Sequence, residues 1–132
     1  MKTKLLLIVL ISFVVSCSPK IVDTWNVDSY EVLQENGQNM TSQNIGSITF
    51  KKNGKGYKNL NYNFFQNNYT HTEEFSWKLN KDDYIIIKES GKSNKNKSNL
   101  NKTWIIVENK AKTQVWKSTD GKNSVQILKL SK

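Results

Sequence analysis

Few side chains in this sequence could perform chemistry. His71 is the single histidine, and Glu73 follows two positions later, so both fall on one face of an extended strand. If the alternation of that strand is unbroken, the pair points inward, where it could orient the polar head of a ligand. A single β-bulge would turn both side chains to solvent. We expect the rim or solvent position, because a carboxylate buried without a partner is costly.

Catalysis finds little support in these residue types. A serine–histidine–aspartate arrangement would have to use His71, and no serine lies in a Gly-x-Ser-x-Gly turn. The adjacent acids at 73–74 point to opposite faces of a strand, and those at 82–83 fall in a turn. One cysteine and one histidine supply no metal cluster. We therefore expect a protein that is not an enzyme, with no metal and no cofactor.

The first sixteen residues have the anatomy of a signal peptide. Lys2 and Lys4 form a positive head, and an apolar stretch follows over residues 5–15. As a helix this stretch would cross only about half of a hydrocarbon core, at about 1.5 Å per residue. A removable signal peptide over residues 1–16 is therefore expected in preference to a membrane span.

The end of this segment resembles a lipidation signal. Val-Val-Ser-Cys at 14–17 resembles the lipobox of bacterial lipoproteins, which implies a lipid on the sulfur of Cys17 and cleavage before it. Residues 17–22 would then be a lipidated N-terminus and tether that anchors the protein to a membrane. The alternative is that Cys17 is an ordinary small apolar residue at the end of a secretory signal. By resemblance to lipoprotein sorting rules, Ser18 is compatible with the outer membrane. Residues 18–21 lack the consecutive acidic residues of some surface-exported lipoproteins, so we expect the domain to face the periplasm.

The charge of the chain argues against a nucleic-acid partner. Removal of Lys2 and Lys4 lowers the formal net charge from +9 to +7, so the mature chain stays basic. All of its positive residues are lysines, and they are scattered along the chain. The bidentate guanidinium contacts that read guanine are therefore absent. A signal peptide would also remove the domain from cytoplasmic nucleic acid.

The mature chain reads as short strands. β-branched and aromatic runs recur between turn signals, and no window keeps the period of an amphipathic helix. The dipeptides Asn53-Gly54 and Asp120-Gly121 favour tight hairpins. About eight antiparallel strands in an all-β, up-and-down meander are expected, near residues 21–32, 45–50, 55–65, 69–79, 84–88, 103–108, 113–118 and 124–130. Residues 33–44 form the first long connection in this interpretation, with room for a short helix.

Two further features of the sequence have alternative interpretations. Aromatic side chains are plentiful on the faces expected to be dry. They either fill a solid core or line a pocket for a small hydrophobic molecule. Together with the polar pair above, the candidate ligand-binding residues are Trp25, Tyr62, Phe64, His71, Glu73, Phe75, Trp77 and Trp104. The lysine-, asparagine- and serine-rich segment 88–102 is expected to be a solvated flexible loop, or else a contact for lipid head groups or an acidic partner.

Four runs together resemble small bacterial lipocalin-like lipoproteins: Thr-Trp-Asn-Val at 24–27, the stretch 48–56, the stretch 75–87, and Thr-Trp-Ile-Ile-Val at 103–107. The resemblance implies an eight-stranded up-and-down barrel over residues 23–132. In lipocalins the first strand usually carries Gly-x-Trp. Here Asp23 stands at the glycine position before Trp25, which also leaves an open sandwich or a distorted barrel as alternatives.

Two functions follow from these observations. The first is a monomeric, lipid-anchored barrel that holds a small hydrophobic ligand in the periplasm. The second is an interaction or inhibitor protein of the cell envelope, with a packed barrel that acts through its loops. A dry interior volume above about 300 Å³ would favour the first.

Overall fold

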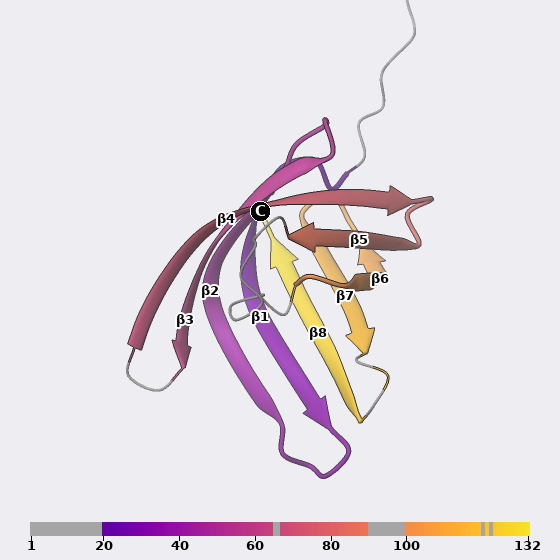
Figure 1. The fold of residues 1–132 in the computed structure, drawn as a ribbon. Coiled ribbons are helices and arrows are strands. Elements are labelled where there is room, and N and C mark those ends of the chain that lie inside the picture. The colour runs from indigo at the N-terminus through magenta and orange to yellow at the C-terminus, as the bar shows by residue number, and fades with distance from the viewer. Residues whose placement is uncertain (1–19, 65–66, 90–99, 120, 122) are drawn as a thin grey trace, which may run out of the picture.

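Eight antiparallel strands close into a barrel in which each strand pairs with its neighbours along the chain (Figure 1). The computed structural model describes residues 20–64, 67–89, 100–119, 121 and 123–132, and none of these lies in a helix. The strands are β1 (Thr24–Gln34), β2 (Met40–Phe50), β3 (Lys55–Phe64), β4 (Asn67–Asn80), β5 (Tyr84–Glu89), β6 (Thr103–Asn109), β7 (Thr113–Thr119) and β8 (Ser124–Ser131). The expected all-β meander is confirmed, including its closure through β1 and β8.

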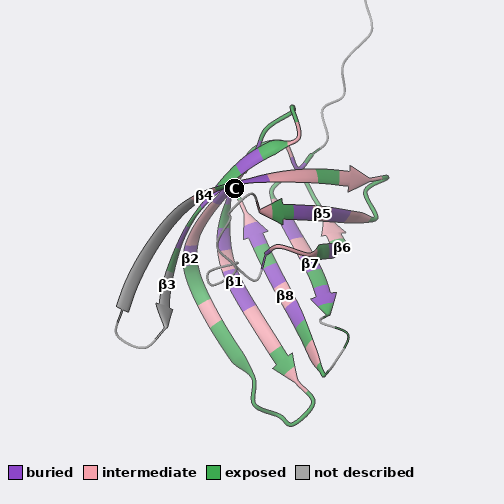
Figure 2. Cartoon of the chain, viewed as in Figure 1, coloured by how far each residue is buried: buried purple, intermediate pink, exposed green. Residues whose placement is uncertain are grey.

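The first strand ends later, and the second strand begins earlier, than the sequence indicated. The expected connection over residues 33–44 is wrong, because β1 continues to Gln34 and β2 begins at Met40. Residues 40–43 pair with β1 instead of forming a helix. The polar composition of this hairpin reflects its exposure, since most residues at its tip face solvent (Figure 2).

Both strands of this hairpin bend at the same level. The register between β1 and β2 shifts between Val27 and Ser29, and on β2 the backbone has positive φ at Asn44 (53°) and Gly46 (133°). A Cβ atom on Gly46 would lie 2.0 Å from the carbonyl oxygen of Asn59 on β3. Glycine is therefore required at 46 both for the backbone conformation and for the close approach of β3.

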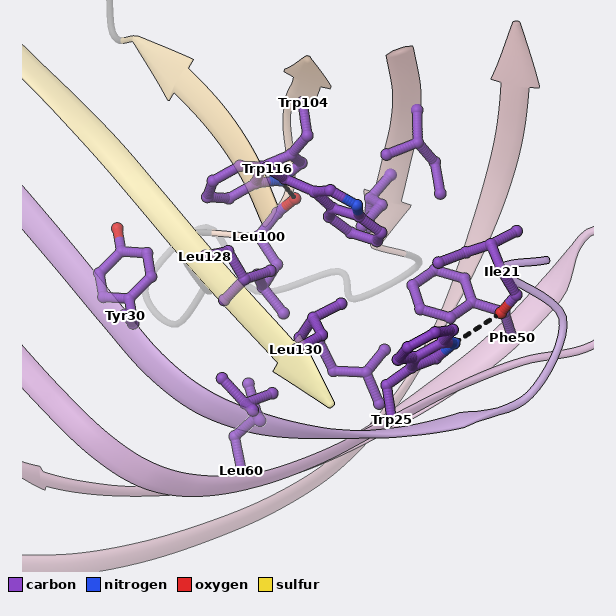
Figure 3. Close-up of a cluster of buried hydrophobic side chains, with 14 of the residues drawn as sticks. Ile21, Trp25, Tyr30, Phe50, Leu60, Leu100, Trp104, Trp116, Leu128 and Leu130 are labelled. Atoms are coloured by element: carbon purple, nitrogen blue, oxygen red, sulfur yellow. Dashed lines mark hydrogen bonds between the residues drawn. The ribbon is translucent and has the colours of Figure 1, made fainter. Parts of the chain in front are cut away.

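Aromatic side chains pack inside the barrel. Trp25, Trp104 and Trp116 have no exposed surface. The indole N–H of Trp25 donates to Ile21 O (2.8 Å) and that of Trp104 to Leu100 O (3.1 Å) (Figure 3). The indole N–H of Trp116 donates to Gln114 Oε1 (3.2 Å). The ring of Phe50 meets the rings of Phe75, Trp77 and Trp116 edge to face, with centroids 5.4 to 5.7 Å apart. Such edge-to-face pairs add to the stabilisation that burial alone provides.

The meander places alternate connections at opposite ends. We call one end the base: it comprises residues 20–23, the turns at 51–54, 81–83 and 110–112, and Lys132. The other end, the rim, comprises the described residues 35–39, 100–102, 121 and 123. At the base, Lys132 donates its backbone N–H to Lys112 O (3.1 Å), and its ammonium lies 2.6 Å from a carboxylate oxygen of Asp23. This contact lowers the pKa of Asp23, with a smaller contribution from the backbone N–H of Thr24.

Candidate functional site

The inner face of the barrel gathers several of the aromatic residues that the sequence singled out. Trp25, Phe75 and Trp104 are buried in the core cluster, and Trp77 is half-buried against it. The indole N–H of Trp77 donates to Lys55 O at 3.0 Å, which holds its ring beside Phe50. Trp25, Phe75 and Trp77 therefore form a packed aromatic floor toward the base, whereas Trp104, near the start of β6, lies beside Leu100 at the rim.

Four of the expected site residues lie partly or wholly outside the described residues. Cys17 lies before the first described residue. Tyr62 and Phe64 belong to β3 and His71 to β4, where the backbone pairs Tyr62 with Tyr69 and Leu60 with His71. Their side chains are not among those described.

Glu73 meets a partner that the sequence interpretation missed. It stands directly opposite Lys58 in the β3–β4 pairing, and the Lys58 ammonium lies 3.1 Å from Glu73 Oε2. Lys58 is 1% exposed, whereas the Glu73 side chain is 30% exposed. The β3–β4 pairing runs without a register shift, so the bulge that would turn Glu73 to solvent does not occur.

A second carboxylate reaches the same ammonium from β5. Lys58 Nζ also donates a hydrogen bond to Glu89 Oε1, and the Glu89 side chain is only 4% exposed. The backbone N–H of Glu89 in turn donates to Asn101 Oδ1 at 3.2 Å. Three strands thus deliver the charges of Lys58, Glu73 and Glu89 to one place, which we call the charged cluster.

The expectation of a wholly solvated loop over 88–102 is wrong at both ends of that segment. Lys88 and Glu89 belong to β5, and Leu100 is 3% exposed within the core cluster. Lys102 donates its ammonium to Gln126 Oε1 at 2.6 Å and lies 5.4 Å from the centre of the Trp104 ring. Residues 90–99 lie outside the described part of the chain.

Further polar groups line the inner face nearby. Gln126 and Ser118 are buried; Gln126 donates to Ser124 Oγ (3.0 Å), and Ser118 donates to Thr103 O (2.7 Å). Tyr30 of β1 stands opposite Leu128 of β8, and its burial raises the pKa of its phenol to about 12 (Figure 3). A neutral phenol, amides and ammonium groups therefore lie on the same inner face as the aromatic floor.

This arrangement suits binding more than catalysis. An apolar surface with a few placed polar groups is typical of sites for small molecules with an apolar body and a polar head. Among the described residues, no group of three or more histidine, cysteine or acidic side chains could hold a metal ion. In the same part of the chain, no helix is long and apolar enough to span a membrane.

The outer face carries a separate depression. Its volume is about 380 Å³, and its lining is rich in asparagine and serine from β1, β2 and β3. The residues that line it are Asn26, Val27, Asn44, Gly46, Ser47, Asn59 and Asn61. It lies at the bend of β1 and β2, and it contains none of the aromatic residues predicted to bind a ligand.

The alternation of β3 could have identified Lys58, because every second residue counted back from Leu60 points inward. The same parity places Lys58 on the inner face, and antiparallel pairing with the next strand sets it against an acid. Glu89 carried a weaker signal, because it closes an Ile-Ile-Ile-Lys-Glu run that continues into a polar segment.

Comparison with known proteins agrees with this architecture. Residues 21–103 match the family model described as a lipocalin-like domain. A solved structure of a lipocalin-like protein from Bacteroides uniformis ATCC 8492 superposes with a TM-score of 0.57 at 13% sequence identity, covering 83% of this chain and 96% of that one. At this identity the likeness concerns the fold. No curated protein matches the chain.

Proposed function

The chain belongs to the lipocalin-like domain family, and from this premise we propose that it is a lipid-anchored protein that holds a small, mainly apolar molecule in its barrel. The fold is of a ligand-binding type. In this proposal the protein is a non-enzymatic monomer attached to the outer membrane through Cys17, and it faces the periplasm.

The observation that carries the proposal is the charged cluster on the inner face. Replacing a buried ion pair with apolar residues of similar volume often leaves a protein equally stable or makes it more stable. The burial of Lys58 and Glu89 is therefore better explained by recognition than by stability. A ligand whose apolar body lies on the aromatic floor would bring its polar head to this cluster.

The ligand-binding residues follow from the same geometry. Trp25, Phe75 and Trp77 would support the apolar body from the floor, and Trp104 and Glu73 would contact the ligand nearer the rim. Tyr62, Phe64 and His71 lie on strands β3 and β4 beyond Leu60 and Glu73, toward the rim, and we assign them to the same site. In this assignment, the inner face of the β3–β4 hairpin contributes most of the polar recognition.

Mass spectrometry of the purified protein tests the proposal directly. Denaturing spectra of the intact protein should show a diacylglycerol-sized mass on Cys17 and cleavage before it. Native spectra of a form that starts at Ser18, incubated with a lipid extract of the envelope, should show a bound hydrophobic molecule. An unmodified Cys17 would remove the anchor, and a clean mass without a bound molecule after incubation would remove the ligand.

A pair of substitutions separates a binding site from a solid core. Trp77→Ala should abolish uptake of the molecule, because Trp77 is half-buried on the inner face. Tyr57→Ala removes an aromatic side chain from the outer face of β3, where Tyr57 is 38% exposed, and should leave uptake unchanged. If Trp77→Ala lowers only the free energy of unfolding, by about 3 to 5 kcal/mol, the barrel is solid.

A solid barrel would support the second candidate, an envelope interaction or inhibitor protein. The observation that favours it is the exposure of apolar side chains on the outer face of β6, where Ile105 is 59% and Val107 is 55% exposed. This candidate is supported over the first if an envelope protein crosslinks to the parent but not to the Ile105→Ser variant, and if native spectra show no ligand.

A further inference from the structure

The base of the barrel carries a concentration of lysines around the point where the chain enters β1. We propose that the base is a membrane-facing surface that binds the head groups of anionic phospholipids. The orientation in this proposal rests on the lipid anchor at Cys17, whereas the affinity of the base for anionic lipid is a property of the barrel itself.

The start of the barrel is fixed close to the anchor. Ile21 is 3% exposed, and its carbonyl accepts the Trp25 indole N–H at 2.8 Å, so the chain is held firmly from this residue onward. Four Cα-to-Cα steps separate Cys17 from Ile21, which extend to roughly 14 Å at most. That maximum reach is less than two Debye lengths, at about 8 Å each in physiological salt. A lipid on Cys17 would therefore keep the base within electrostatic reach of the head groups.

Three hairpin turns bring lysines to the same end. The β2–β3 turn carries Lys51 and Lys52, the β4–β5 turn Lys81, and the β6–β7 turn Lys110 and Lys112, and all five are exposed. Lys20 and Lys132, at the two ends of the described chain, add to this set. Across the base the acids are the aspartates at 23, 82 and 83, so positive charge is in excess.

Ion pairs reduce this excess at two positions. Lys132 pairs with Asp23 at 2.6 Å, and Lys110 pairs with Glu108 at 2.8 Å. Lys51, Lys52 and Lys112 therefore provide the better test. All three are exposed on turns that flank the entry of the chain into β1.

The base is also preorganised. Backbone hydrogen bonds close its turns, from Gly54 N to Lys51 O (3.2 Å) and from Lys110 N to Thr113 O (2.9 Å). Others join the base to its neighbours, from Phe50 N to Asp23 O (2.9 Å) and from Trp77 N to Gly54 O (2.9 Å). The lysines thus project from a fixed frame, which reduces the conformational entropy lost on binding.

The strands offer a matched control. Lys88 on β5, Lys117 on β7 and Lys129 on β8 are exposed and lie outside the turns of the base. A triple substitution there removes the same charge as one at the base, but from the side of the barrel.

The first test uses the form that starts at Ser18, because all strand pairings of the closed barrel lie within residues 24–131. Its binding would be measured on vesicles of phosphatidylglycerol with phosphatidylcholine and on vesicles of phosphatidylcholine alone. We expect a preference for the anionic vesicles. A juxtamembrane lysine contributes about 1 kcal/mol, or roughly fivefold in affinity. Lys51→Gln, Lys52→Gln and Lys112→Gln together should therefore lower the affinity by up to roughly a hundredfold.

The control decides where the interaction lies. Lys88→Gln, Lys117→Gln and Lys129→Gln together should lower the affinity less than roughly fivefold. An equal loss from both triple variants would overturn the proposal, since it would show a response to net charge alone. A larger loss from the control would move the lipid contact to the side of the barrel and overturn it as well, as would equal binding to the two kinds of vesicle.

A second test reports the orientation of the intact, anchored protein. A fluorophore would be attached through Ala111→Cys at the base or Gln38→Cys at the rim, in protein reconstituted into the anionic vesicles. Both residues are exposed. Quenching by a lipid-borne quencher should be strong at 111 and weak at 38. Equal quenching would overturn the orientation, whereas failure to lipidate Cys17 would contradict the anchor and leave the vesicle result of the Ser18 form to decide the affinity of the base.

Discussion

Lys58 and Glu73 are direct cross-strand partners on β3 and β4, and their charged groups meet on the inner face of the barrel at 3.1 Å. The same ammonium donates to Glu89 of β5, so a single buried lysine links three consecutive strands. Because Lys58 is 1% exposed and Glu89 is almost as deeply buried, removing the ammonium alone would destabilise the barrel, even where the intact pair adds little stability.

Lys58→Met should lower the free energy of unfolding by about 3 to 5 kcal/mol. The substitution keeps most of the side-chain volume, but it removes the ammonium that meets the buried carboxylate of Glu89. Urea unfolding followed by tryptophan fluorescence measures the loss. The double variant Lys58→Met with Glu89→Gln should recover most of it, because the buried negative charge is then also removed. A Lys58→Met variant as stable as the parent would contradict the structural role given to the cluster.

Gly46→Ala should be among the most destabilising glycine substitutions, because the new Cβ would lie 2.0 Å from Asn59 O at a φ of 133°. Gly37→Ala is the matched comparison. Gly37 also has a positive φ, 79°, but no atom lies within 4 Å of its Cβ position. We expect a loss of about 1 kcal/mol at 37 from backbone strain alone, and a much larger loss or failure to fold at 46. Thermal unfolding of both variants measures the difference, and equal midpoints would show that β3 can move away.

Stability should fall in alkaline solution partly through Tyr30. Burial raises the pKa of Tyr30 to about 12 in the folded state, whereas an unfolded tyrosine ionises near 10. The contribution of Tyr30 to the free energy of unfolding is therefore fully present below about pH 10 and is lost as the pH rises toward 12. Tyr30→Phe should lose less stability than the parent between about pH 10 and pH 12 in urea unfolding. Tyr57→Phe, which removes an exposed phenol, should behave as the parent does, and identical profiles for all three proteins would contradict the role of Tyr30.

Strand alternation and turn dipeptides were enough to predict the meander. The alternation of Leu60 with its exposed asparagine neighbours, and the Asn53-Gly54 turn, both occur as the pattern indicated. The first hairpin could not be predicted from composition, because residues 40–44 are polar and yet residues 40–43 pair with β1. Their strand structure depends on partners that are distant in sequence, and local patterns do not report such partners.

The candidate site was only partly predictable for the same reason. Alternation placed Phe75 and Trp77 on the inner face, but the environment of Glu73 depended on pairing. Burying a carboxylate looked too costly while no cation was assigned to it, and the register of β3 against β4 supplies one in Lys58. Leu100 was assigned to a polar segment by its neighbours, although it packs into the core.

Leu100→Ala tests whether the segment before β6 is part of the barrel. Leu100 is 3% exposed, and its carbonyl accepts the indole N–H of Trp104 at 3.1 Å, so the segment is held by both packing and a buried hydrogen bond. Truncation of a buried leucine lowers the free energy of unfolding by about 2 to 5 kcal/mol. Val107→Ala, at a position that is 55% exposed, should cost less than about 0.5 kcal/mol in the same urea titration. If the two losses are alike, Leu100 does not pack in the core in solution, and the segment would be free to behave as the solvated loop that its composition indicates.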